Sequence, residues 1–233
     1  MIDLSKETKK VYSQFNQDGV LESIFNNIGT TNKYFVEFGS DGTDEGQGNT
    51  PFLRHEFGFD GLLMDGTLHK EKRKYELHRE FIRADTINET FEKYNVPKEF
   101  DFLSIDIDGQ DFYVMQSIDL TKFSPRVVSI ETNPAIPAPH SLVQRYDPNW
   151  IWEGWHFYGC SIEAITKLMN QKNYSLVCYC GVDAIFVENS CCPDKYFENI
   201  NDTIYHYKNG VVDPDGQTEA FNIINKYGEF FVV

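Results

Sequence analysis

The sequence predicts an α/β fold built on a mostly parallel sheet with helices on both faces. β-rich runs alternate with helical segments from residue 34 to residue 131, which is typical of parallel strands joined by crossover helices. The run at 100–106 is almost continuously apolar, as expected of a strand buried on both faces. Two later runs, 174–179 and 184–188, are separated only by a short turn, so we expect an antiparallel edge.

Periodicity and turn residues divide the first part of the chain. Apolar residues recur at helical intervals before Gly29, so a helix is expected over 11–28. Short runs that end in an acid or a glycine turn predict three strands, at 34–38, 61–65 and 80–84. Helices are expected in the intervals, at 50–56, where Pro51 suits a first turn, and at 86–94.

The same alternation continues in the second part of the chain. The apolar strand at 100–106 is followed by a predicted crossover helix at 112–118 and a strand at 126–131. A long loop rich in proline and tryptophan then occupies 133–158, and a helix at 161–171 precedes the two closing strands.

Length and composition favour a single domain, because 233 residues with 41% hydrophobic content can bury one substantial core. We expect an N-terminal helical segment at 1–33, a core at 34–188 and a C-terminal extension at 189–233. In the extension, three short runs allow either a small extra hairpin or a packed extension: 202–207, 210–212 and 230–233.

Charge and apolar patterning exclude several classes of function. A net charge of −15 repels a phosphate backbone, which argues against a nucleic-acid partner. The chain has no apolar run long enough to span a membrane and no signal-like N-terminus, so a cytoplasmic protein is expected. Its five cysteines are odd in number and cluster late, which favours reduced thiols over a disulfide framework, and their spacing is a poor match to zinc sites.

The turn after the first strand has the features of a cofactor loop. Gly39 and Gly42 allow a ligand to approach the backbone, and Glu37 offers an acceptor for a cationic amino acid group. The acids beside them oppose a dinucleotide pyrophosphate, which disfavours NAD. Asp65, at the end of the second strand, can accept from ribose hydroxyls, and Asp85 can receive an adenine amino group. The alternative for each acid is a solvated loop carboxylate.

These runs resemble the FkbM-type family of class I S-adenosylmethionine-dependent methyltransferases. The similar segments are YFVEFGSDGTDEGQGNT at 34–50, GFDGLLMDG at 58–66, DFLSIDIDGQDFYV at 101–114, SQFNQDGV at 13–20 and YGCSIEAITKL at 158–168. The resemblance implies a Rossmann-like sheet of seven strands. The sequence is rich in Phe, Asn and Tyr, and in this composition it is also similar to glycan-modifying methyltransferases of large DNA viruses. The cofactor residues that it implies are Glu37, Gly39, Ser40, Asp41, Asn49, Thr50 and Asp65, with Gln14 or Gln17 reaching in from the N-terminal helix. Where members often carry a glutamate at the end of the second strand, this sequence has the shorter Asp65.

Acidic residues also crowd the end of the strand at 100–106. Asp106, Asp108 and Asp111 lie within six residues, and like charges this close raise one another's pKa unless a cation neutralises them. Glu131 and Asn133, at the end of the next strand, add further oxygens. We therefore expect Mg²⁺ or Mn²⁺ held by Asp106, Asp108, Glu131 and Asn133. The alternative is that Asp106 and Asp108 bind the cofactor and cap the following helix.

A hydroxyl acceptor needs a base, and the sequence offers Asp108, Asp111 and His156, with His140 as a weaker candidate. All three tryptophans fall in residues 147–158, which we call the acceptor loop. Flat aromatic faces pack against sugar rings, so a carbohydrate acceptor is expected; the alternative is that they anchor the loop to the core or to a second subunit.

The function predicted from these features is O-methylation of a sugar hydroxyl on a glycan or glycosylated small molecule, assisted by a divalent metal. Two alternatives stay open. One is an oxidoreductase that uses NAD or a nucleotide sugar, and the other is a carbohydrate-binding module without catalysis.

Overall fold

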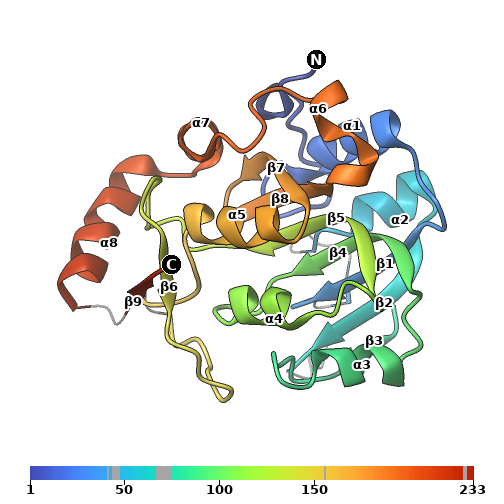
Figure 1. Ribbon diagram of the computed structural model, residues 1–233, viewed down its shortest axis with the longest axis horizontal. Coiled ribbons are helices and arrows are strands. Elements are labelled where there is room, and N and C mark those ends of the chain that lie inside the picture. Colours follow the sequence, from blue (N-terminus) through green and yellow to red (C-terminus); the bar gives the residue numbers. More distant parts are fainter. Residues whose placement is uncertain (41, 44–47, 67–74, 155, 228–229) are drawn as a thin grey trace.

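A computed structural model describes residues 1–40, 42–43, 48–66, 75–154, 156–227 and 230–233 of the chain. Within these residues the core is a seven-stranded sheet with the strand order β3-β2-β1-β4-β5-β8-β7 (Figure 1). The first five strands are parallel, and β8 runs antiparallel to both of its neighbours, so the expected mixed α/β sheet is confirmed. The strands are β1 (Tyr34–Phe38), β2 (Asp60–Asp65), β3 (Leu77–Arg79), β4 (Glu99–Ile105), β5 (Ser124–Glu131), β7 (Tyr174–Cys180) and β8 (Asp183–Glu188).

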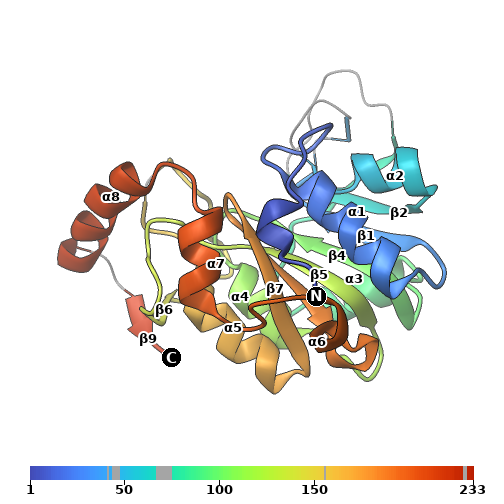
Figure 2. The same ribbon diagram turned by 90° about the horizontal axis from the view of Figure 1, so that it is seen from above.

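Helices cover both faces of this sheet, because the central strands are apolar on both sides (Figure 2). One face packs against α1 (Gln17–Ile28) and α2 (Pro51–Phe57), through residues such as Phe25 and Leu53. The other face packs against α3 (Ile87–Lys93), α4 (Asp111–Ser117) and α5 (Ile162–Gln171). The result is a three-layer arrangement in which the carboxyl ends of the parallel strands meet at one edge.

A buried ion pair braces the opposite edge of the sheet. Asp101 on β4 is fully buried and accepts from the backbone N–H groups of Thr31 and Lys33. Arg126 on β5 pairs with Asp101 at 2.9 Å and donates to the carbonyl oxygens of residues 28 and 29, at the end of α1. This pair ties the end of α1 to the amino-terminal side of two central strands, far from the candidate site.

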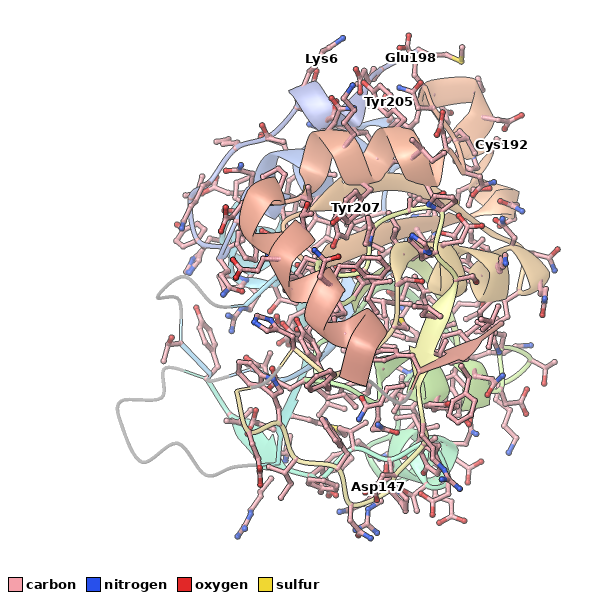
Figure 3. The ribbon with its side chains drawn as sticks, turned by 90° about the vertical axis from the view of Figure 1, so that its left-hand side faces the viewer. Lys6, Asp147, Cys192, Glu198, Tyr205 and Tyr207 are labelled. Carbon is pink, nitrogen blue, oxygen red and sulfur yellow. The ribbon has the colours of Figure 1, made fainter. Side chains whose placement is uncertain are left out.

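The C-terminal part of the chain packs along the side of the sheet next to β7. It comprises a short 3₁₀ turn at Asn189–Cys191, α6 (Pro193–Tyr196), α7 (Thr203–Gly210), α8 (Pro214–Tyr227) and β9 (Phe230–Val232), and a further 3₁₀ turn at Leu4–Lys6 lies near the N-terminus. β9 pairs antiparallel with β6 (Leu142–Gln144), and α8 packs on a small apolar cluster around Ile136. Tyr207 of α7, labelled in Figure 3, donates its hydroxyl to the Pro134 carbonyl at 2.6 Å. Among the described residues there is no helix long and apolar enough to cross a bilayer.

Three expected elements differ from the structure. The N-terminal helix begins at Gln17 rather than residue 11, because the Asp18 carboxylate accepts from the N–H groups of residues 11, 12 and 13 and folds them into a loop. The predicted strand at 80–84 is wrong: β3 ends at Arg79, opposite the last residue of β2, where the ladder has no further partner. Residues 202–207 form no hairpin strand, because Asp202 caps α7 through the Tyr205 N–H.

His206 of α7 carries a pH-dependent share of the stability. Its side chain is buried, and burial lowers its pKa from 6.5 to about 4, against the weaker opposite effects of the Asn199 backbone and of the charges of Asp202 and Asp3. Because the unfolded chain binds this proton more readily, stability is full above pH 6.5 and is lost as the pH falls toward 4. At pH 5 we expect a loss of about 2 kcal/mol in unfolding free energy from this residue.

The measurement is urea unfolding of the wild type and His206→Phe at pH 7.5 and pH 5. The variant should lose less stability than the wild type over this interval. Equal losses in the two proteins would contradict the assignment.

Candidate active site

A cavity of about 630 Å³ opens at the edge where the parallel strands end. Five strand ends contribute to it, because β1 to β5 all run in the same direction. The residues at or just after these strand ends that line it are Gly39, Asp65, Glu80, Asp106 and Glu131. Further lining residues come from the acceptor loop, from the segments that follow β2, β3 and β4, and from Gln14, Tyr146 and Val182. In Figure 3, Asp147 marks this end of the molecule, opposite Lys6 and Glu198.

Gly39 brings the β1 loop against the end of β4. Its φ is +77°, a conformation that favours glycine, and a Cβ built there would collide with the carbonyl oxygen of Asp106. The Gly39 N–H also donates to the Met64 carbonyl at 3.0 Å, which fixes the loop beside β2. The two glycine properties, left-handed backbone and no side chain, are therefore both needed at this point of the cavity.

Glu37 lies beneath the cavity rather than in its lining. Its buried carboxylate accepts from the Asn49 N–H at 2.6 Å and from the Thr50 hydroxyl, at the start of α2. Burial raises the pKa of Glu37, while these hydrogen bonds act in the opposite direction. In this structure Glu37 therefore ties the residues before α2 to β1, and its expected direct contact with a cationic group stays a prediction.

The structure separates the two N-terminal glutamines. Gln14 lines the cavity, whereas Gln17 is buried. The Gln17 amide nitrogen donates to Asp183, and its carbonyl oxygen accepts from the Phe15 N–H at 3.0 Å. Of the two residues that the resemblance offered, Gln14 is the one placed to contact a ligand.

Three carboxylates meet at the floor of the cavity. Asp106, Asp108 and Glu131, which we call the acidic trio, have oxygen atoms that all lie within 4.8 Å of one another. Removal from solvent, and then the charge of Asp183 and of the neighbouring acids, raises the pKa of Asp106 well above its usual value. Burial and the charge of Asp106 raise the pKa of Glu131 in the same way. A bound cation would relieve this repulsion, and a set of carboxylate oxygens suits Mg²⁺ or Mn²⁺.

The acceptor loop closes over the trio through direct contacts. The Trp150 indole N–H donates to the Asp108 carbonyl at 2.9 Å, and its ring fills the space above Gly109 that a side chain would need. The Asp147 N–H donates to the Gln110 side chain at 3.1 Å. The indole N–H of Trp150 is therefore used to hold the loop, while its ring also lines the cavity.

Trp152 and Tyr158 form that aromatic wall. Trp152 is 45% exposed, and its ring centroid lies 5.9 Å from that of Tyr158. Both side chains line the cavity. Burial, followed by the charge of Glu131, raises the pKa of the Tyr158 hydroxyl, so it stays protonated and available as a donor.

The comparison with protein families agrees with this geometry. The chain matches the methyltransferase FkbM domain over residues 41–176, more than half of its length. The chain belongs to the FkbM methyltransferase family. It is accordingly an S-adenosylmethionine-dependent enzyme, and the family and the class I sheet expected from the sequence are both confirmed. No curated protein and no solved structure matches the chain.

Several expected site residues of this FkbM methyltransferase lie outside the cavity lining. Ser40, Asn49 and Thr50 are buried, and within the cofactor loop the Ser40 hydroxyl accepts from the Gly42 N–H at 3.2 Å. Asp85 is exposed in the turn before α3, because β3 ends earlier than expected. Asp41 lies outside the described residues.

Among the other candidates for base and metal ligand, some line the cavity and others do not. Asp111 is buried and accepts from the N–H groups of Ile107 and Gly109, both at 2.9 Å, and burial raises its pKa to about 7. The Asn133 amide donates to the carbonyl oxygens of His156 and Tyr158, so it supports the acceptor loop. The His156 side chain is exposed and absent from the lining, whereas Asp108 is exposed to the cavity.

Sequence reasoning about this FkbM methyltransferase did not single out Asp183, Tyr158 or Phe81. Asp183 begins β8 and is buried below the trio. Phe81 lines the cavity, and its ring would lie 3.1 Å from a Cβ built on Gly66, next to Asp65. An acid directly after the turn of the closing hairpin was the one available signal for Asp183; Phe81 was assigned to a strand that is not formed there.

Proposed function

We propose that this FkbM methyltransferase transfers the methyl group of S-adenosylmethionine to a hydroxyl of a glycan or glycosylated small molecule, with a divalent cation at the acidic trio. The observation that carries the proposal is the position of the trio, Asp106, Asp108 and Glu131. The trio lines the same cavity as Gly39 and Asp65 and as the aromatic wall of Trp152 and Tyr158.

The cofactor half of the cavity fits a nucleoside attached to an amino acid. Asp65 can accept from the ribose hydroxyls, and Phe81 beside Gly66 offers a flat apolar surface to an adenine ring. Gly39 leaves room for the cofactor to approach the end of β1, and Gln14 offers both a donor and an acceptor to its amino acid end.

The acceptor half fits a ring that has both apolar faces and hydroxyl groups. Trp152 supplies a partly exposed aromatic surface, and the protonated Tyr158 hydroxyl can donate to an acceptor oxygen. Asp108 is the most exposed member of the trio, which supports its carboxylate as the group that takes the proton from the reacting hydroxyl. A sugar ring carries apolar faces and hydroxyl groups on the same small molecule, a combination that lipids and phosphorylated acceptors match less well.

The residues of the chain share the catalytic work. Bound S-adenosylmethionine supplies an electrophilic methyl group, and a cation held by the trio would lower the pKa of an acceptor hydroxyl. Glu131 keeps the Asp108 backbone in place by accepting its N–H at 3.1 Å. Asp111 holds the turn at residues 107–109, and Trp150 covers it, so the trio is preorganised before the acceptor enters.

Isothermal titration with S-adenosylhomocysteine, with and without Mg²⁺ or Mn²⁺, is the direct test. We expect micromolar binding that changes little with metal. Methyl transfer to an array of glycans, measured with radiolabelled cofactor, should require the metal and stop on adding a chelator. Transfer that is unaffected by chelation would overturn the metal assignment, and transfer to proteins or lipids instead of glycans would overturn the acceptor class.

A further inference from the structure

We infer that Asp183 is a positioning residue for the methyltransferase reaction, because it joins the segment carrying Gln14 to the cofactor loop beneath the cavity. This inference rests on the proposed cofactor half of the site. Asp183 is the first residue of β8 and is 2% exposed. It touches none of the cavity space itself, since Val182 is the residue of its turn that lines the cavity.

The carboxylate of Asp183 is surrounded by side chains that donate to it. Gln17 donates to one oxygen, and Ser129 donates to the other at 3.2 Å. Asn49 donates to that second oxygen at 3.5 Å and to the Ser104 hydroxyl at 3.1 Å. A carboxylate has only acceptor sites, so it satisfies all three donors at once, which an amide at the same position cannot do.

The first arm of this network holds the N-terminal segment. Gln17 cannot rotate its amide to donate elsewhere, because its carbonyl oxygen already accepts from the Phe15 N–H. The Phe15 ring also packs directly on Gly181, where a Cβ would collide with it. Gln14 lines the cavity, and two residues that follow it are held in place: Phe15 packs on Gly181 in the turn between β7 and β8, and Gln17 donates to Asp183 at the start of β8.

The second arm holds the cofactor loop. Asn49 precedes α2, and its backbone N–H donates to Glu37 while its side chain reaches Ser104 and Asp183. One residue thus connects the ends of β1, β4 and β8. The cavity lining around Gln14 and the lining around Gly39 are thus both connected to the buried carboxylate of Asp183. This connection fixes the distance between them.

The test compares S-adenosylhomocysteine binding by Asp183→Asn with binding by Ser129→Ala. Both variants lose hydrogen bonding at the same carboxylate, and both should melt at a lower temperature than the wild type. Only Asp183→Asn places an amide N–H against the donors of Gln17 or Asn49. We expect its dissociation constant to rise about tenfold or more, and that of Ser129→Ala to stay within about twofold of the wild type.

Hydrogen exchange identifies which arm has opened. In Asp183→Asn, amides at 9–16 and at 48–50 should exchange faster, whereas in Gln17→Ala the increase should be confined to 9–16. If Asp183→Asn does not fold, Gln17→Ala carries the test, with an expected threefold to tenfold weaker binding.

Binding by Asp183→Asn within twofold of the wild type, or equal losses in Asp183→Asn and Ser129→Ala, would overturn the inference. Failure of the wild type itself to bind would instead count against the cofactor assignment, and the exchange comparison would still test the two arms.

Discussion

Replacing Glu131 by glutamine is expected to lower methyl transfer by roughly a thousandfold while leaving S-adenosylhomocysteine binding nearly unchanged. Glu131 belongs to the acidic trio and lines the cavity. Removing one carboxylate from the trio weakens the hold on a cation, whose stabilisation of a developing alkoxide is worth several kcal/mol. The glutamine oxygen can still accept the Asp108 N–H, so the local backbone should keep its conformation.

Stability should respond in the opposite direction to activity. Burial and neighbouring acids raise the pKa of Glu131, so its charged form is unfavourable in the folded protein without metal. We expect Glu131→Gln to melt at the same temperature as the metal-free wild type or higher, and to lose the rise in melting temperature caused by Mn²⁺.

Asp147→Asn is the matched control, because Asp147 is an acid that lines the same cavity but stands outside the trio. It should retain most of the activity and the full response to Mn²⁺. If Asp147→Asn were as inactive as Glu131→Gln, the effect would belong to the general charge of the cavity and not to a metal site.

Glu37→Ala is expected to abolish measurable cofactor binding and to lower the unfolding free energy by about 2 to 5 kcal/mol. The change leaves two buried donors, the Asn49 N–H and the Thr50 hydroxyl, without their acceptor. Those donors immediately precede α2, so the start of this helix loses its hydrogen bonds to β1. Titration with S-adenosylhomocysteine and urea unfolding measure the two effects.

Glu37→Gln distinguishes a brace from a direct ligand. Its carbonyl oxygen can accept the Asn49 N–H and its amide can donate to Thr50, so a brace survives the change and binding should stay within about threefold of the wild type. Because the pKa of Glu37 is raised in the folded protein, ionisation costs stability as the pH increases, and the glutamine variant should gain relative to the wild type at pH 8. Loss of binding in Glu37→Gln would instead support a direct contact between the Glu37 carboxylate and the cationic end of the cofactor.

The sheet was largely predictable because its strands are buried on both faces. A short, nearly continuous apolar run such as the one in β4 is typical of a strand buried on both faces, so the sequence predicts it directly. The strand β3 was misplaced because only 77–79 pair with β2, and a ladder of three residues leaves little pattern in the sequence. The start of α1 was misplaced for a different reason: a single carboxylate, that of Asp18, captures three N–H groups that helical periodicity would have assigned to the helix.

The acidic trio was predictable from the sequence for a topological reason. Asp106 and Glu131 end adjacent parallel strands, and such ends always meet at one edge of the sheet. By itself, therefore, the sequence determined the family, the sheet and the grouping of the three carboxylates of the trio. Which polar residues line the cavity was decided only by the tertiary structure. Glu37 and Gln17 turn away into buried hydrogen bonds, while Gln14, Phe81 and Tyr158 reach the cavity. The physical reason is that a buried polar group must find its partners, and for Glu37, Gln17 and Asp183 those partners come from segments up to 166 positions apart in the chain.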